Sequence, residues 1–537
     1  MDLPANEYLI MKNKGMVMKR HARGALALLV ATALVGGPAW GNEREDLEVV
    51  RQTTINLIFA LVEKGVLTQD AAQALVKQAE DAARKKVAAT QGPNDKVVRV
   101  PYIPETVKRE IRDQVKQEVV AQAKAEHWGD VNAVPEWVGR LHWAGDIRLR
   151  NQQDMYAKNN ATPVNVDSWY GLPIGSTGNT IDSRDRLRLR ARLGLTAKIG
   201  DMVSGGIRLA TGSDNNPLST NQTLGNTANK YSVWVDQAYL KLEPLQWLSI
   251  LGGRMPSPWF STNLVWHNDL TFEGVAANTT YRFDERRSAY LTAGVFPLQD
   301  IAPSTSNKAL NKWLYGVQAG FDLAALSGSG AKFGLALYEY KHVEGIPNTV
   351  GSNGDYDNTA PQFRQHGNTM FFDPNALTPA STYKLASKFR ELNLTGQLDI
   401  ANFDPAHIIL NADYVRNIGF NQAEIANRTG YMVDKQNTGF QFQVTVGQPK
   451  IVALGDWQAF IGYRRLQRDA VLDAFTDSDF HLGGTDTKGF FIGGSYGLDK
   501  NTWLNLRWMS ADSISGVGVN GKPLGIDVLQ MDLNAKF

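Results

Sequence analysis

Residues 186–199 alternate almost perfectly between polar and apolar side chains, with arginine at positions 186, 188, 190 and 192. Successive side chains of a β-strand point to opposite faces, so this pattern predicts a strand with one wet face and one aliphatic face. A strand of this length, tilted near 45°, rises about 30 Å and could cross the roughly 25 Å apolar band of an outer membrane. An amphipathic strand of a soluble sandwich explains this stretch equally well.

The same alternation recurs along the chain from residue 141 onward. It predicts 16 strands, at 141–150, 186–199, 203–211, 232–242, 246–254, 272–283, 288–296, 313–323, 331–341, 388–400, 406–416, 437–447, 457–466, 487–498, 501–510 and 526–537. Short turns alternate with long polar loops between them, which favours a transmembrane barrel over a sandwich. We therefore predict an all-β transmembrane barrel of 16 antiparallel strands. Eighteen is the alternative, because loops 151–185 and 342–387 are long enough to hide a hairpin.

The polar face of the predicted strands indicates a wet interior. Phe440 and Phe442 face one way while Gln441 and Gln443 face the other, and a packed core could not accept such amides without partners. The segment 232–242 changes phase near its middle, which predicts a β-bulge between Val235 and Ala238. Aromatic residues are expected where the apolar face meets headgroups. They are Trp247, Tyr281, Trp457 and Tyr496 at the short-turn rim, and Phe490 and Trp508 at the other.

The front of the chain follows different patterns. Residues 1–41 resemble a secretory signal peptide, with a basic start, an apolar core and small residues before the cleavage point, and the true start lies near Met18. Residues 42–135 show helical periodicity and form a predicted periplasmic helical region, whereas 136–537 form the barrel. The helix at 105–126 has one narrow apolar stripe, so it needs a partner. A hairpin folding back on the earlier helices and a trimeric coiled coil both satisfy this need.

Composition excludes several other classes of site. The chain has no cysteine, so disulfides and thiolate metal sites are excluded. Its formal net charge of +2 becomes about −1 once residues 1–41 are removed, so the charge gives no indication of nucleic-acid binding. The string GGSYG around Ser495 matches GxSxG but lies within a predicted strand, and GVGVNG at 516–521 lies in a predicted loop without a βαβ unit. The histidines are scattered, and we predict no catalytic residue, metal site or cofactor.

Several segments together resemble the putative porin family of Gram-negative outer membranes. They are KGVLTQDAAQALVKQAEDAA, PYIPETVKREIRDQV, WAGDIRLRNQ, DQAYLKLEPLQWLSILGGRMPSPWF and DLTFEGVAANTTYRF. The last strand ends in Phe537 after alternating apolar residues, which resembles the signal read by the barrel assembly machinery, although Asp532 stands where that signal usually has glycine. The resemblance implies a diffusion channel, a homotrimer, and a third external loop, Met255 to Leu270, folded into the lumen.

In such a channel, fixed charges in a narrow wet passage set ion selectivity. The predicted pore-lining residues are Arg148, Arg150, Arg186, Arg188, Arg190, Arg192, Arg208 and Arg254. The predicted constriction-loop residues, on the opposing acidic side, are His267, Asp269 and Glu273. A structural alternative is that the arginines pair with lumen carboxylates such as Asp146, Asp182 and Asp236 and stiffen the wall.

The sequence thus predicts an outer-membrane porin of a Gram-negative bacterium, embedded in lipid, with its N-terminal region in the periplasm. It passes small hydrophilic solutes and ions by diffusion, and the arginine surplus favours anions. A barrel hydrolase is one alternative, and it predicts an activity that is lost in Ser495→Ala. A tether to the cell wall or another partner is the second, and it predicts weaker envelope attachment when the helices are deleted.

Overall fold

The computed structural model describes residues 138–325, 328–517 and 521–537. The predicted signal peptide and the predicted helices of 42–135 lie outside the described residues. Within the described ranges, no helix is long and apolar enough to span a membrane.

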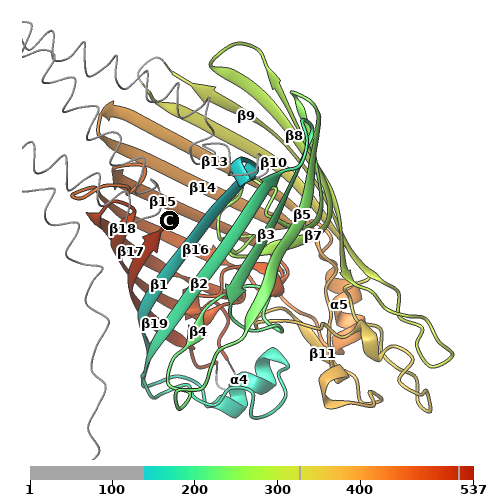
Figure 1. Ribbon diagram of the computed structural model, residues 1–537. Helices are drawn as coiled ribbons and strands as arrows, with labels where there is room; N and C mark the ends of the chain where they lie inside the picture. The colour runs from blue at the N-terminus through green and yellow to red at the C-terminus, as the bar shows by residue number, and fades with distance from the viewer. Residues whose placement is uncertain (1–137, 326–327, 518–520) are drawn as a thin grey trace, which may run out of the picture. The chain divides into compact units, whose positions relative to one another are not determined.

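Sixteen long antiparallel strands form a closed barrel (Figure 1). Closure is direct, because β1 (Leu141–Tyr156) pairs with β2 (Arg184–Lys198) on one side and with β19 (Gly525–Lys536) on the other. The remaining long strands are β3 (Val203–Thr211), β5 (Val233–Leu245), β6 (Leu248–Pro256), β7 (Thr271–Arg282), β8 (Arg287–Gln299), β9 (Lys312–Ala324), β10 (Gly330–Lys341), β13 (Arg390–Phe403), β14 (Ala406–Asn417), β15 (Thr438–Gly447), β16 (Trp457–Leu466), β17 (Thr487–Asp499) and β18 (Thr502–Ser513). The predicted 16-stranded all-β barrel is confirmed.

The shorter elements lie in the long loops, apart from η1 at the start of the barrel. These are η1 (Val138–Arg140), which precedes β1, and then α4 (Pro163–Tyr170), β4 (Gln222–Thr223), η2 (Asp357–Thr359), β11 (Met370–Phe372), η3 (Pro379–Ser381), β12 (Tyr383–Leu385), α5 (Gln422–Thr429), η4 (Asp473–Phe475) and η5 (Phe480–Leu482). The alternative of 18 strands is wrong. The first long loop holds helix α4, and β11 and β12 form a separate two-stranded sheet that does not enter the barrel.

Two details of the strands show how tertiary pairing adds to the local pattern. β1 continues to Tyr156, beyond the predicted end at Arg150, because its last residues pair with β2 or β19 although residues 151–154 are polar on both faces. On β5, Val235 and Gln237 pair with consecutive residues of β3, which leaves Asp236 as the extra residue. This register shift confirms the bulge predicted from the change of phase.

The two faces of the barrel differ in the way that the alternation predicts. Leu149 and Leu187 face outward and are 48% and 58% exposed, whereas their neighbours Arg150 and Gln152 face inward and are buried. The largest buried apolar cluster lies inside the barrel, where the loop of residues 257–270 (L3) and the loop of residues 467–486 (L7) pack against the wall. The ring of Trp266 from L3 lies 5.0 Å from that of Phe272 on β7. Apolar packing and charged side chains therefore share the interior.

Candidate functional site: a charged passage inside the barrel

The register of β1 and β2 brings pairs of arginines directly opposite each other on the inner face. Arg148 lies opposite Arg190, and Arg150 lies opposite Arg188. Like charges in opposite positions repel each other, so this arrangement needs counter-charges or polar partners from elsewhere. These two strands hold seven arginines, and we call the six that follow Arg184 on β2 or lie on β1 the basic wall. They are Arg148, Arg150, Arg186, Arg188, Arg190 and Arg192.

Asp146 on β1 and Asp269 on L3 both bridge Arg190 and Arg192. Asp146 lies 2.8 Å from Arg190 Nη2 and 2.7 Å from Arg192 Nε, and Asp269 lies 2.8 Å from Arg192 Nη1. Burial raises the pKa of Asp269, but the two guanidinium groups outweigh burial and hold this pKa below its usual range. Asp269 is therefore ionised at neutral pH. It contacts the basic wall directly, whereas the sequence analysis placed it on the opposing side.

Two further arginines of the wall also have carboxylate partners. Arg150 is 4% exposed and lies 2.7 Å from Asp532 of β19 and 3.3 Å from Asp479 of L7. Arg186 pairs with Asp154 at 2.5 Å. Charge-assisted hydrogen bonds of this kind fix both side chains in one position. These two arginines therefore help to hold the wall rigid.

Arg148 and Arg188 differ from the rest of the wall because their hydrogen-bond partners are neutral. Arg148 Nη2 donates to Asn221 Oδ1 at 2.5 Å, and Arg188 Nη1 donates to Gln152 Oε1 at 3.0 Å. Within the described residues, neither guanidinium lies within ion-pair distance of a carboxylate. Their positive charges are consequently the least compensated of the wall.

Two other predicted arginines and Glu273 lie on strands other than the two that carry the basic wall. Arg208 on β3 forms an ion pair with Asp236, the bulged residue of β5. Arg254 on β6 pairs with Glu273 of β7, which lies directly opposite it, and Glu273 is 56% exposed. Among the three carboxylates expected to pair with arginine, Asp146 and Asp236 do so. The third, Asp182, lies in the first long loop, where its backbone N–H and carbonyl form hydrogen bonds with the side chain of Asn179.

His267 links L3 to L7. Its backbone N–H donates to the carbonyl of Phe475 at 2.8 Å, its Nδ1 accepts from the backbone of Asp269, and Ser478 Oγ lies 3.1 Å from its Nε2. Further along the same contact, Thr476 Oγ1 donates to a carbonyl of L3 at 2.8 Å. L3 therefore does not stand alone inside the barrel, because L7 is attached along its length.

The sequence analysis missed L7 as part of the site. Asp477 is buried 2.9 Å from Arg464 of β16 and 3.6 Å from Arg507 of β18. Burial raises the pKa of Asp477, yet Arg464 and Arg507 lower it below its usual range, and Arg150 and Arg507 do the same for Asp479. Both carboxylates are therefore ionised. A signal was available in the sequence, because the loop contains the mostly apolar run AVLDAF, which does not suit a loop in water.

Two cavities follow the basic wall. One of about 230 Å³ is lined by arginines, aspartates and amides, including Arg148, Arg150, Arg190, Arg507, Asp269, Asp479, Asp532, Asn263 and Asn505. The other, of about 570 Å³, is lined by four arginines and one aspartate, namely Arg184, Arg186, Arg188, Arg364 and Asp154, together with neutral residues and two histidines. Fixed charges of this density orient dipolar solutes and concentrate counter-ions.

The described residues offer little for other chemistry. Among them, no group of three histidine, aspartate or glutamate side chains could hold a metal ion. Ser495 lies within β17, and its hydroxyl donates to Asn505 of the neighbouring strand at 3.2 Å. A GxSxG nucleophile requires a sharp turn from a strand into a helix, which differs from this position in the middle of a strand. The GxGxxG match at 516–521 includes residues outside the described ranges.

Comparison with solved structures yields outer-membrane barrels of low sequence identity. The outer membrane channel DcaP of Acinetobacter baumannii is 12% identical with a TM-score of 0.39, and the match covers 74% of this chain and 97% of that one. The high-pH structure of Pseudomonas putida OprB is 11% identical with a TM-score of 0.44, covering 76% and 97%. Salmonella typhi OmpF in complex with daunomycin is 12% identical with a TM-score of 0.38, covering 74% and 97%.

No curated protein matches the chain. A family model does, and its description is "Putative porin". The match extends over residues 51–537, which includes every strand of the barrel. The chain therefore belongs to this putative porin family.

Proposed function

We propose that the chain forms a water-filled channel in the outer membrane of a Gram-negative bacterium and passes small hydrophilic solutes and ions, with a preference for anions. Family membership and the closed barrel support a channel rather than an enzyme. The observation that carries the anion preference is the larger cavity along the basic wall. Four arginines line it against one aspartate, so its fixed charge is positive.

The experiment measures the reversal potential of purified protein in a planar bilayer under a salt gradient. Arg148 and Arg188 are the positions to change, because their hydrogen-bond partners are neutral and their removal leaves no carboxylate without its partner. The double variant Arg148→Gln with Arg188→Gln should shift selectivity towards cations. The matched double variant with lysine at both positions keeps the charges and should keep the native selectivity.

Three results would contradict the proposal. Folded, heat-modifiable protein that gives no conductance would overturn the channel. A native reversal potential on the cation side would overturn the anion preference. Equal shifts in the glutamine and lysine variants would show that the charges of Arg148 and Arg188 do not set the selectivity.

The same proposal covers the parts of the chain that precede the barrel. Residues 1–41 act as a signal peptide, residues 42–135 form a helical region in the periplasm, and the barrel assembles as a homotrimer after the assembly machinery has bound Phe537. The family match, which begins at residue 51, supports the helical region and the barrel, whereas the signal peptide rests on the basic, apolar and small residues of 1–41. Deletion of residues 42–135 tests the alternative of a tether to the cell wall, since a tether predicts loss of envelope attachment with conductance intact.

A further inference from the structure

A third cavity, of about 570 Å³, lies inside the barrel on the side away from the basic wall. It is bounded by β6 to β9, L3, L7, the loop of residues 212–232 and the loop of residues 342–389 (L5). Of the eight arginines predicted to line a pore, only Arg254 reaches it. Cavities of this size are typical of sites that enclose one small molecule.

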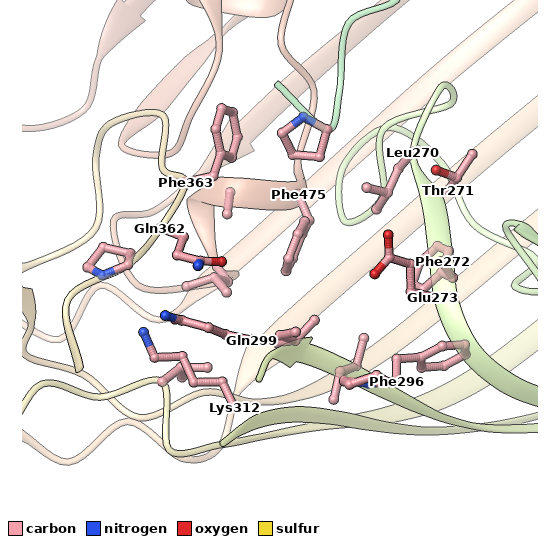
Figure 2. A pocket seen from close by; sticks show the side chains of 18 of the residues that line it. Leu270, Thr271, Phe272, Glu273, Phe296, Gln299, Lys312, Gln362, Phe363 and Phe475 are labelled. Carbon is pink, nitrogen blue, oxygen red and sulfur yellow. The ribbon is translucent and has the colours of Figure 1, made fainter. Parts of the chain in front are cut away.

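Five aromatic side chains contribute to the apolar surface of this cavity, beside aliphatic residues and prolines. Phe272 and Phe296 come from the wall, and Phe475 comes from L7 (Figure 2). The rings of Phe272 and Phe296 lie 5.1 Å apart, and the ring of Phe475 stacks on Tyr340 with an interplanar angle of 10°. Because these contacts hold the rings in place without a ligand, an apolar molecule could bind with little ordering cost.

The polar groups gather at two sides of the same cavity. Figure 2 shows Lys312, Gln299 and Gln362 together on one side, and Thr271 and Glu273 on the other, with Phe475 between them. Glu273 is already paired with Arg254 of the neighbouring strand. Asp214, from the loop of residues 212–232, also lines the cavity, but its side chain is exposed. Lys312 is therefore the buried charge of this cavity that lacks a charged partner among the described residues.

Lys312 is 5% exposed, and its ammonium group donates one hydrogen bond, to the carbonyl of Ala360 at 2.6 Å. An ammonium group has three donors, so two remain for other partners. Within the described residues, Lys312 forms no ion pair with a carboxylate. Gln299 Oε1 and Thr271 Oγ1 are buried without a hydrogen-bond partner. A buried cation and buried polar atoms that lack partners are costly unless something binds them.

We propose that this cavity is a binding site for a small aromatic carboxylate, with the carboxylate on Lys312 and the ring among Phe272, Phe296 and Phe475. The carboxylate supplies the missing counter-charge, and the aromatic body fills an apolar space to which five rings contribute. A hydroxyl or amide of the bound molecule could satisfy Gln299 or Thr271. The site is separate from the basic wall and does not depend on whether ions pass along that wall.

The test uses the full-length protein in lipid nanodiscs and isothermal titration calorimetry with 3-phenylpropionate. The structure predicts that this anion binds and that 2-phenylethylamine, which has a similar ring and the opposite charge, does not. Lys312→Gln removes the charge at nearly constant length and should weaken binding at least tenfold. Lys308→Gln is the matched control, because Lys308 is exposed and already paired with Asp355. It should leave the affinity unchanged.

Phe475→Ala provides a second variant in case Lys312→Gln disturbs L5, whose residue Ala360 accepts the hydrogen bond of Lys312. It keeps the charge of Lys312 and removes one ring, and it should also weaken the binding of 3-phenylpropionate. The proposal is wrong if the native protein does not bind 3-phenylpropionate, if it binds the amine equally well, or if both variants bind like the native chain. Binding in a protein that conducts no ions would overturn the proposed channel and leave this site intact.

Discussion

The replacement Asp477→Asn tests whether L7 is held inside the barrel by one buried charge. Asp477 is 1% exposed and lies between Arg464 and Arg507, and Arg464 also donates to Gln441 at 2.7 Å. The backbone N–H of Asp477 donates to the carbonyl of Asn263 in L3. Asparagine has nearly the same shape but no charge. The variant therefore leaves two arginines in the interior facing a neutral amide.

The expected magnitude follows from the cost of leaving a buried charge without its partner, which is about 3–5 kcal/mol. Each 1.4 kcal/mol changes an equilibrium about tenfold, so the population in which L7 is detached should rise about 100- to 4,000-fold. The strands of the barrel pair independently of this contact. Local opening of L7 should therefore increase while the unfolding of the barrel itself changes little.

Amide hydrogen exchange in nanodiscs measures this opening residue by residue. Exchange within 467–486 should accelerate in Asp477→Asn, with the amides of β16 and β18 unchanged. Asp284→Asn is the matched control, because Asp284 and Arg287 form the same kind of pair in a tight turn, where the side chains are 42% and 66% exposed. An exposed pair contributes about 0–1 kcal/mol. Native exchange rates in L7 of Asp477→Asn, or equal acceleration by the control, would refute the reasoning.

Two further predictions concern pH and closure of the barrel. Burial and the nearby His481 lower the pKa of His366 to about 3. Neutral His366 therefore contributes its full stability to the packing of L5 on L7 above pH 6.5. This contribution is lost as the pH falls from 6.5 towards 3. Burial raises the pKa of Asp473 to about 7, so this group changes the stability with pH in the opposite direction. Proteolysis rates at pH 7.5 and pH 5 must therefore be compared between the native protein and His366→Phe. The variant should lose the part of the acid-induced increase in proteolysis that is due to His366. Gly145→Val should slow closure of the barrel, because a Cβ there would lie 2.9 Å from the backbone carbonyl oxygen of Arg192 on β2, as well as against the ring of Phe537. Heat-modifiable mobility measures closure, and a native mobility shift would contradict this.

The strands could be predicted from the sequence because alternation is a local signal that the barrel preserves. Each strand has one lipid face and one wet face, so its pattern repeats every two residues wherever the strand lies. The bulge at Asp236 was also predictable, since one extra residue shifts the phase. The extension of β1 beyond Arg150 was not predictable, because residues 151–154 are polar on both faces and only pairing with β2 and β19 identifies them as strand.

The site was only partly predictable because loops have no such period. The sequence placed six arginines on one face, which the register of β1 and β2 brings together. It did not indicate that Asp269 contacts those arginines, since the path of L3 depends on packing against L7. The pairing of Arg464 with Asp477 depends in the same way on where L7 enters the lumen. Pairings between a strand and a distant loop leave no pattern along the chain.

L3 and L7 together explain why two different chemistries can share one barrel. On one side of these loops lie the arginines of β1 and β2, and on the other lie the rings of β7 and β8. L7 contributes to both, because Asp479 lines the charged cavity and Phe475 lines the aromatic one. Detachment of L7 in Asp477→Asn should therefore affect both at once, raising the conductance and weakening the binding of 3-phenylpropionate. Because Phe475→Ala should weaken binding without changing the charged cavity, a comparison of the two variants shows whether L7 is the shared partition.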